Sequence, residues 1–128
     1  MSTVGVFGTM EMHQLLAALG TRPADQGLCF DFDGVMPTGL SSYRGFYEHL
    51  AVEYGHDSPE CRRTVGEFVT LLRSALGQTF EGYKGGTYRM GMQTPVWVGS
   101  WGHCNSTAIV GICEAQHWCI LKTEWVDV

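Results

Sequence analysis

The fold is set by T-V-G-E-F-V-T-L-L-R-S-A-L-G, from Thr64 to Gly77. Glu67 follows Thr64 by three residues, which predicts a capping box at the start of a helix. Gly77 predicts its end. One apolar stripe at helical spacing requires a partner layer in the core; its members are Val65, Phe68, Val69, Leu72, Ala75 and Leu76.

Short strands are predicted after this helix. The segments 94–98, 108–112 and 118–121 are apolar and rich in β-branched or aromatic residues, and Gly, Ser and Asn separate them. Turn residues between short apolar runs are typical of an antiparallel meander. The C-terminal half is therefore expected to form three successive strands of one sheet.

The N-terminal half gives a second helix and weaker strand patterns. Thr9 to Leu19 reads as a short helix with Thr9 as its N-cap, and Gly20 ends it. The remaining predictions are a strand at 28–32, a loop at 37–42, a strand or extended stretch at 43–54 and a surface loop at 56–63. Runs of strands with two helices outside them indicate a single α+β domain over residues 1–128, with a mainly antiparallel sheet.

The composition excludes several classes of function. A chain of 128 residues with 45% apolar content fits one domain with an ordinary core. Its net charge of −5 argues against a broad face for duplex nucleic acid. Five cysteines are an odd number, and neither a signal peptide nor an apolar membrane span of about 18 residues appears. Free thiols in a reducing cytoplasm are expected.

The most suggestive functional segment is T-F-E-G-Y-K-G-G-T-Y-R, from Thr79 to Arg89. Its glycines remove side-chain bulk, allow positive φ and leave backbone N–H groups open to a ligand. Its rings and cations suit a nucleotide. The spacing is not that of a P-loop. An equally simple interpretation is a structural tight turn in which the Lys84 ammonium contacts only water.

A second short segment, S-S-Y-R-G at 41–45, adds another cation on a turn. Arg44 is suited to bind phosphate or carboxylate, although a lone arginine also caps carbonyls or forms surface ion pairs. Trp101, in a glycine-rich turn, is the tryptophan most expected to be exposed, whereas core packing or a subunit interface also explains the tryptophans. The predicted ligand-binding set is Ser42, Tyr43, Arg44, Phe80, Tyr83, Lys84, Gly85, Gly86, Tyr88, Arg89 and Trp101.

Two sequence patterns resemble parts of catalytic or metal-binding motifs, but each lacks other features that such a site needs. C-F-D-F-D-G-V at 29–35 resembles the first motif of haloacid-dehalogenase-type phosphatases, with Asp31 and Asp33 in the catalytic places, but the chain has too few βα units for that fold. A zinc site is conceivable in a group within seventeen residues, although it has no C-x2-C pair; the group is His103, Cys104, Cys113, His117 and Cys119. A Cys104–His117 nucleophile pair lacks a signature. We predict no catalytic residue, metal or cofactor.

Four segments in order resemble a group of small bacteriophage proteins. They are S-Y-R-G at 42–45, T-V-G-E at 64–67, T-F-E-G-Y-K-G-G at 79–86 and T-P-V-W-V at 94–98. The likeness spans residues 42 to about 112, and the C-terminal end departs from it. The resemblance implies a phage protein that acts in the host bacterial cytoplasm against host defence. It looks compatible with Thoeris anti-defence sponges, which sequester cyclic ADP-ribose-type or cyclic oligonucleotide signals in pockets formed by oligomers.

Three functional hypotheses follow. The first is an anti-defence protein that sequesters a nucleotide-derived signal without catalysis, with phosphate held by Arg44, Lys84 and Arg89, and it expects a homo-oligomer. The alternative is an inhibitor that binds a host defence enzyme through exposed Trp and Tyr. A small nucleotide hydrolase is the third, and its base or metal site cannot be assembled from the sequence. No membrane partner is expected.

Overall fold

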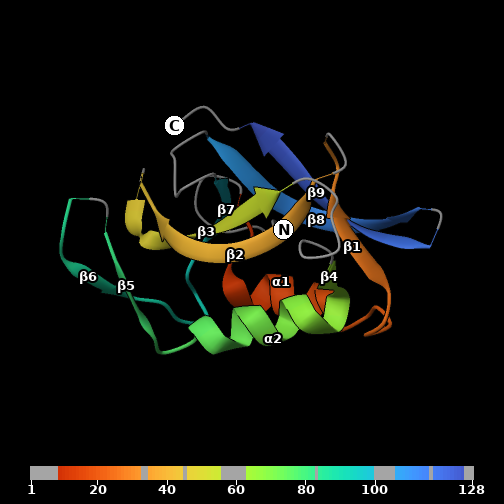
Figure 1. The fold of residues 1–128 in the computed structure, drawn as a ribbon, viewed down its shortest axis with the longest axis horizontal. Helices are drawn as coiled ribbons and strands as arrows, with labels where there is room; N and C mark the ends of the chain where they lie inside the picture. The colour runs from red at the N-terminus through yellow and green to blue at the C-terminus, as the bar shows by residue number, and fades with distance from the viewer. Residues whose placement is uncertain are drawn as a thin grey trace, which may run out of the picture.

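In the part of the chain that the structure describes, a large curved sheet has two helices on one of its faces (Figure 1). The computed structural model describes residues 9–32, 35–44, 46–55, 63–82, 84–99, 106–115 and 117–125. Within these residues the elements are α1 (Met12–Leu19), β1 (Gly27–Phe30), β2 (Met36–Tyr43), β3 (Phe46–Gly55), β4 (Arg63–Thr64), α2 (Val65–Ala75), β5 (Thr79–Glu81), β6 (Thr87–Arg89), β7 (Val96–Gly99), β8 (Thr107–Ala115) and β9 (Trp118–Trp125).

The main sheet has seven strands in the order β2-β3-β7-β8-β9-β1-β4. Most neighbours are antiparallel, and two pairs are parallel: β3 with β7 and β1 with β9. β5 and β6 form a separate two-stranded hairpin. The predicted α+β class with a mainly antiparallel sheet is confirmed, and so is the C-terminal meander β7-β8-β9.

α2 begins as the sequence predicts. The hydroxyl of Thr64 accepts a hydrogen bond from the Glu67 N–H at 3.2 Å, and a Glu67 carboxylate oxygen accepts one from the Thr64 N–H at 2.9 Å. Gly77, just after the helix, has φ +75°, which is the backbone conformation that favours glycine. These local signals therefore fix both ends of the helix.

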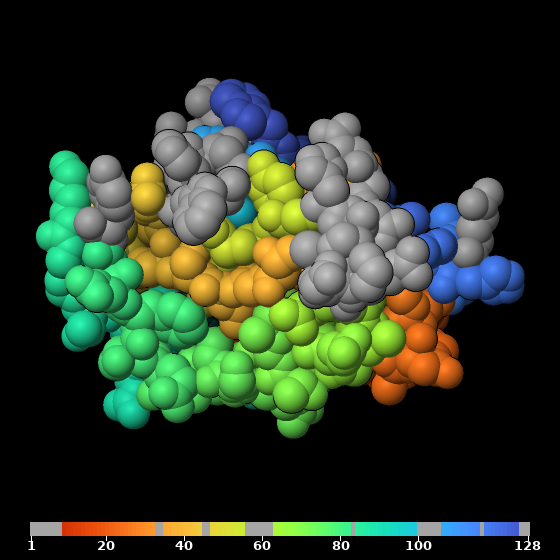
Figure 2. Space-filling model, viewed as in Figure 1, coloured from red at the N-terminus to blue at the C-terminus, as the bar shows by residue number. Residues whose placement is uncertain are grey.

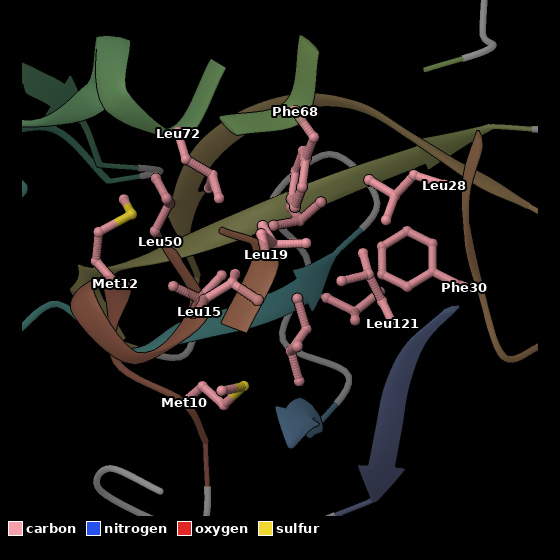
Figure 3. Close-up of a cluster of buried hydrophobic side chains, with 14 of the residues drawn as sticks. Met10, Met12, Leu15, Leu19, Leu28, Phe30, Leu50, Phe68, Leu72 and Leu121 are labelled. Atoms are coloured by element: carbon pink, nitrogen blue, oxygen red, sulfur yellow. The ribbon is translucent and has the colours of Figure 1, made fainter. Parts of the chain in front are cut away.

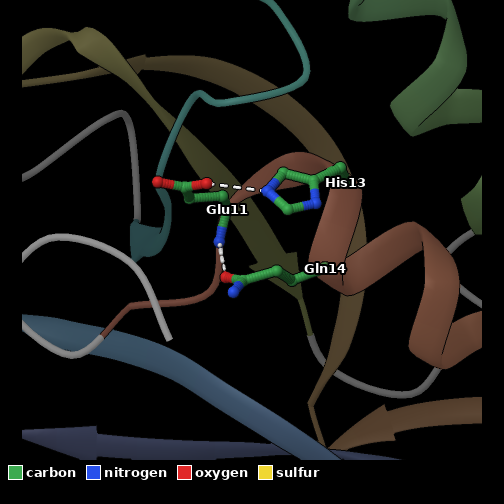
Figure 4. A network of polar contacts seen from close by, with 3 residues as sticks. All are labelled: Glu11, His13 and Gln14. Atoms are coloured by element: carbon green, nitrogen blue, oxygen red, sulfur yellow. Dashed lines mark hydrogen bonds and ion pairs between the residues drawn. The ribbon is translucent and has the colours of Figure 1, made fainter. Parts of the chain in front are cut away.

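α1 begins later than predicted, at an N-cap on Glu11 instead of Thr9. Gln14 Oε1 accepts from the Glu11 N–H at 2.9 Å, and the Glu11 carboxylate lies 2.7 Å from His13 Nε2 (Figure 4). The chain is still extended through Met10, because its N–H donates to the Ile109 carbonyl and its carbonyl accepts from the Val96 N–H. Contacts with two distant strands therefore delay the start of the helix.

The predicted loop at 37–42 is wrong, because these residues lie in β2 and pair with β3 from Met36 to Tyr43. The register shifts between Pro37 and Gly39, which accommodates a proline at the end strand of the sheet order. The side chain of Arg63 in β4 donates to the carbonyls of Pro37 and Thr38 at 3.2 and 3.0 Å. The Arg63 guanidinium thus provides hydrogen bonds to two carbonyls where the pairing of β2 is irregular.

The extended stretch predicted at 43–54 is confirmed from Phe46 onward as β3, whereas Tyr43 ends β2 and Arg44 lies in a turn. The surface loop predicted at 56–63 lies outside the described residues except for Arg63, which belongs to β4.

The main core lies between the helices and the sheet (Figure 3). Strand alternation sends Leu50 and Val52 of β3 into this core, and Ala51 to a smaller cluster on the opposite face. That cluster also contains Tyr43, Trp97 and Ala108. The sheet is therefore packed on both faces in its centre, which makes β3 and β7 a rigid base for side chains at their ends.

Candidate functional site

The glycine-rich segment forms the turn of the β5–β6 hairpin. The Gly82 N–H donates to the Gly86 carbonyl and the Gly85 N–H donates to the Gly82 carbonyl, both at 2.9 Å. Gly85 and Gly86 have φ of +96° and +82°. The turn therefore explains these glycines, and the N–H groups of Gly82 and Gly85 are used within it. Lys84 is exposed, and Tyr83 lies outside the described residues.

The hairpin stands at one end of the molecule, beside the turn between β2 and β3 (Figure 2). The rings of Tyr47 in β3 and Tyr88 in β6 meet edge to face, with centroids 5.6 Å apart and planes at 67°. Gly82 is buried beneath them: a Cβ there would lie 2.8 Å from the Tyr88 ring and 3.0 Å from the Tyr47 ring. Glycine at position 82 is therefore required for the close approach of the two tyrosines.

These tyrosines line a surface hollow, which we call the hairpin hollow. It has a volume of about 410 Å³ and is lined by Arg44, Tyr47, Glu48 and Tyr88. Arg44 and both tyrosines are half-buried, and Glu48 is exposed. The structure thus brings together two predicted binding residues, Arg44 and Tyr88, from segments far apart in the sequence.

A second hollow, the loop hollow, shares Glu48 with the hairpin hollow and has a volume of about 600 Å³. Its lining consists of Glu48, His49, Arg89 and the connection from Gly91 to Pro95. Arg89 donates from Nε to the Gly77 carbonyl at 3.1 Å, which anchors its guanidinium at this surface. A third predicted residue, Arg89, therefore faces a neighbouring hollow and not the one that holds Arg44.

His49 is a buried polar residue of this region, with 7% of its surface exposed. Trp97 Nε1–H donates to His49 Nδ1 at 3.0 Å, which places the proton of the neutral ring on Nε2. Burial lowers the pKa of His49 below its ordinary value of 6.5, and the carboxylate of Glu48 opposes that shift. The loop hollow is therefore lined by a neutral imidazole at neutral pH.

The remaining predicted residues serve the packing of the fold. The Ser42 hydroxyl donates to the Tyr47 carbonyl at 2.6 Å. Tyr43 is fully buried, stacks on Trp97 with centroids 4.8 Å apart, and accepts a hydrogen bond from the Ser106 N–H through its hydroxyl. Phe80 packs against the main core. None of these three lines either hollow, and Trp101 lies outside the described residues.

Sequence reasoning missed Tyr47, Glu48 and His49. They follow one another in a stretch whose apolar residues fit neither the helical nor the strand period, so no local signal singled them out. The register of β3 with β2 shifts between Ser42 and Tyr43, so these three residues lie in an irregular part of β3, where the Tyr47 ring contacts Tyr88 of the hairpin. Only the tertiary structure could identify them as hollow-lining residues.

Among the described residues, neither the phosphatase-like segment at 29–35 nor the Cys/His group at 103–119 forms a catalytic or metal site. Asp31 accepts hydrogen bonds from the Thr123 N–H at 2.9 Å and from its hydroxyl at 2.5 Å, which ties the end of β1 to β9. Cys113 pairs with Ile120, so strand alternation puts Cys113 and Cys119 on opposite faces of the sheet. In the described part of the chain, no three His, Cys, Asp or Glu side chains are grouped to hold a metal ion. Asp33, His103 and Cys104 lie outside it.

Two further findings bear on identity. No helix among the described segments is both long and apolar enough to cross a membrane. Comparison with known proteins found no matching family model, no matching curated protein and no matching solved structure.

Proposed function

We propose that this protein binds a nucleotide-type small molecule at the hairpin hollow and holds it without converting it. The observation that carries the proposal is the meeting of Arg44, Tyr47 and Tyr88 around one hollow. At about 410 Å³ this hollow is within the usual size range of small-molecule sites, roughly 300–1,000 Å³.

Each part of a nucleotide has a partner at this surface. The guanidinium of Arg44 binds phosphate through charge-assisted hydrogen bonds, and the ring of Tyr47 or Tyr88 stacks on a base. Glu48 repels phosphate but accepts hydrogen bonds from ribose hydroxyls or a base amino group. The carboxylate therefore orients the ligand, with its phosphate toward Arg44 and its sugar or base toward Glu48.

The biological role that fits this site is that of a phage anti-defence protein which sequesters a nucleotide-derived immune signal in the host bacterial cytoplasm. The support for it is the resemblance of four sequence segments to small phage proteins, together with the hollow that Arg44, from one of those segments, helps to line. Both hollows lie at the surface of a single copy of the chain, so tight capture requires a second copy to cover the ligand. We therefore propose a homo-oligomer.

Titration calorimetry with a nucleotide such as AMP tests this proposal. Arg44→Gln removes a charged donor, which is worth about 1.5–3 kcal/mol and corresponds to roughly 10- to 150-fold weaker binding. Arg73→Gln is the matched control, because Arg73 is an exposed arginine on α2 that lines neither hollow. Equal affinity in the two variants would exclude Arg44 as a ligand-binding residue.

A protein-directed inhibitor is the second candidate, supported by two exposed tryptophans on β9. Trp118 and Trp125 are 38% and 67% exposed. They stand seven positions apart on one strand, so they point to opposite faces and form no single patch. This candidate predicts recovery of a host polypeptide in a pull-down, whereas the sponge predicts recovery of a nucleotide.

A further inference from the structure

We propose that the loop hollow is a binding site of its own, and that it takes a short peptide with free ends, whose carboxylate binds Arg89 and whose ammonium group binds Glu48. Both residues line this hollow of about 600 Å³. Of the described lining residues, only Glu48 also belongs to the hairpin hollow. The inference therefore goes beyond the proposed nucleotide site and does not depend on it.

The two charged side chains of the loop hollow do not pair with each other. Among the described residues, the Glu48 carboxylate accepts no hydrogen bond and forms no ion pair. The Arg89 guanidinium makes a single hydrogen bond to a described residue, from Nε to the Gly77 carbonyl at 3.1 Å, and it has further N–H donors. Both side chains are exposed. The hollow thus presents one positive and one negative group that a ligand can reach.

One charge of each sign selects a ligand that carries both. A purely anionic ligand would meet the Glu48 carboxylate and a purely cationic one would meet Arg89, and like charges at close range cost free energy. A carboxylate pairs with a guanidinium through charge-assisted hydrogen bonds, and an ammonium group donates to a carboxylate in the same way. Because Glu48 and Arg89 do not contact each other, the two groups of the ligand must be set apart, as they are in a peptide.

The connection between β6 and β7 forms a preorganised wall of this hollow. Thr94 Oγ1 accepts from the Gly91 N–H at 2.8 Å, and the Thr94 N–H donates to the Gly91 carbonyl at 3.1 Å. The Met92 carbonyl accepts from the His13 N–H at 2.8 Å. The Thr94 carbonyl accepts from the Met12 N–H at 2.9 Å. The wall is therefore fastened to the first turn of α1, so binding requires little ordering of the protein, which strengthens affinity.

Apolar surface for the side chains of a peptide lies in the same hollow. Met92 is 52% exposed and lines the hollow together with Pro95. Its flexible thioether can pack against apolar side chains of different shapes. The ring of His49, also in the lining, is uncharged at neutral pH, because burial lowers its pKa. A peptide of apolar residues with two free ends therefore matches both the charges and the surface between them.

Titration calorimetry with the dipeptide leucyl-leucine, its C-terminal amide and its N-acetyl derivative tests this inference. The amide lacks the carboxylate, and the acetylated peptide lacks the ammonium group. We expect the wild type to bind leucyl-leucine at least about tenfold more tightly than either derivative, as is typical for hydrogen bonds to charged groups. Arg73→Gln, on the exposed face of α2, is the control and should keep both preferences.

Two variants assign the two charges separately. Arg89→Gln should remove the preference for leucyl-leucine over its amide and keep the preference over the acetylated peptide. Glu48→Gln should do the reverse. Arg89→Lys, which retains the charge, should restore part of the first preference. A merely structural role of either residue would weaken all three peptides alike and leave both preferences unchanged.

Three outcomes would overturn the inference. They are failure of the wild type to bind leucyl-leucine, equal affinity of the wild type for the three peptides, and unchanged preferences in Arg89→Gln or in Glu48→Gln. Circular dichroism checks the folding of each variant, and Arg89→Lys replaces Arg89→Gln should the latter unfold. None of these results bears on the hairpin hollow, because the titration with AMP tests nucleotide binding separately.

Discussion

Replacing Gly82 with alanine inserts a methyl group between the two tyrosines of the hairpin hollow. The added Cβ would lie 2.8 Å from Tyr88 Cε2, 3.0 Å from Tyr47 Cδ2 and 3.0 Å from the Gly85 carbonyl oxygen. Carbon atoms pack at about 3.5–4.0 Å, so at least one ring must move. The carbonyl belongs to the hairpin turn, which leaves the rings as the groups that shift.

The expected loss of stability follows from these contacts. Overpacking costs about 1–3 kcal/mol, and the lower entropy of an alanine in the unfolded chain returns about 0.4–1 kcal/mol. The net free energy of unfolding should fall by about 1–2 kcal/mol, a decrease in Tm of roughly 3–8 °C for a domain of this size. Displacement of Tyr47 or Tyr88 should also weaken nucleotide binding.

Thermal and urea unfolding followed by circular dichroism measure the change. Gly39→Ala is the matched control, because a Cβ at Gly39 would meet nothing within 4 Å. We expect this control to be as stable as the wild type or up to about 1 kcal/mol more stable, because it has only the entropy gain of alanine and no clash. A Gly82→Ala protein as stable as the control, with unchanged affinity for nucleotide, would refute the packing argument.

Three further predictions concern the rest of the fold. Thr64→Ala removes the α2 cap and should lower the free energy of unfolding by about 1 kcal/mol in urea, whereas Thr70→Ala on the exposed face should not. Because burial lowers the pKa of His49, the unfolded chain binds the proton first, so stability should fall as pH drops below 6.5; His49→Gln should reduce that slope in pH-dependent urea titrations. Burial raises the pKa of Cys119 to about 11, so iodoacetamide at pH 8 should alkylate the exposed Cys113 well before Cys119 in peptide mass maps, and equal rates would contradict the buried position.

The parts of the fold that the sequence predicted are those with local causes. The capping box of Thr64 and Glu67 and the stripe that follows act within a few residues, so α2 was predictable. β2 was not, because Pro37 and Gly39 disfavour strands locally and only pairing with β3 holds them extended. The start of α1 was missed for the same reason, since contacts of Met10 with two distant strands set it.

The same contrast between local and long-range causes applies to the candidate site. Residue type alone was sufficient to nominate Arg44, Tyr88 and Arg89 as binding residues, and the fold places them around two neighbouring hollows. Tyr43 was nominated with Arg44 from the same short segment, yet it turns into the small core beneath Trp97. Sequence proximity could not distinguish these two neighbours, because the face that each presents depends on the pairing of β2.

Native mass spectrometry of the purified protein with AMP, followed by denaturation and mass analysis of the released molecule, tests the central claim most directly. The account predicts an oligomer that retains AMP and releases it with its mass unchanged. Protein without retained nucleotide would contradict binding at the hairpin hollow, and release of a cleaved product would contradict capture without catalysis.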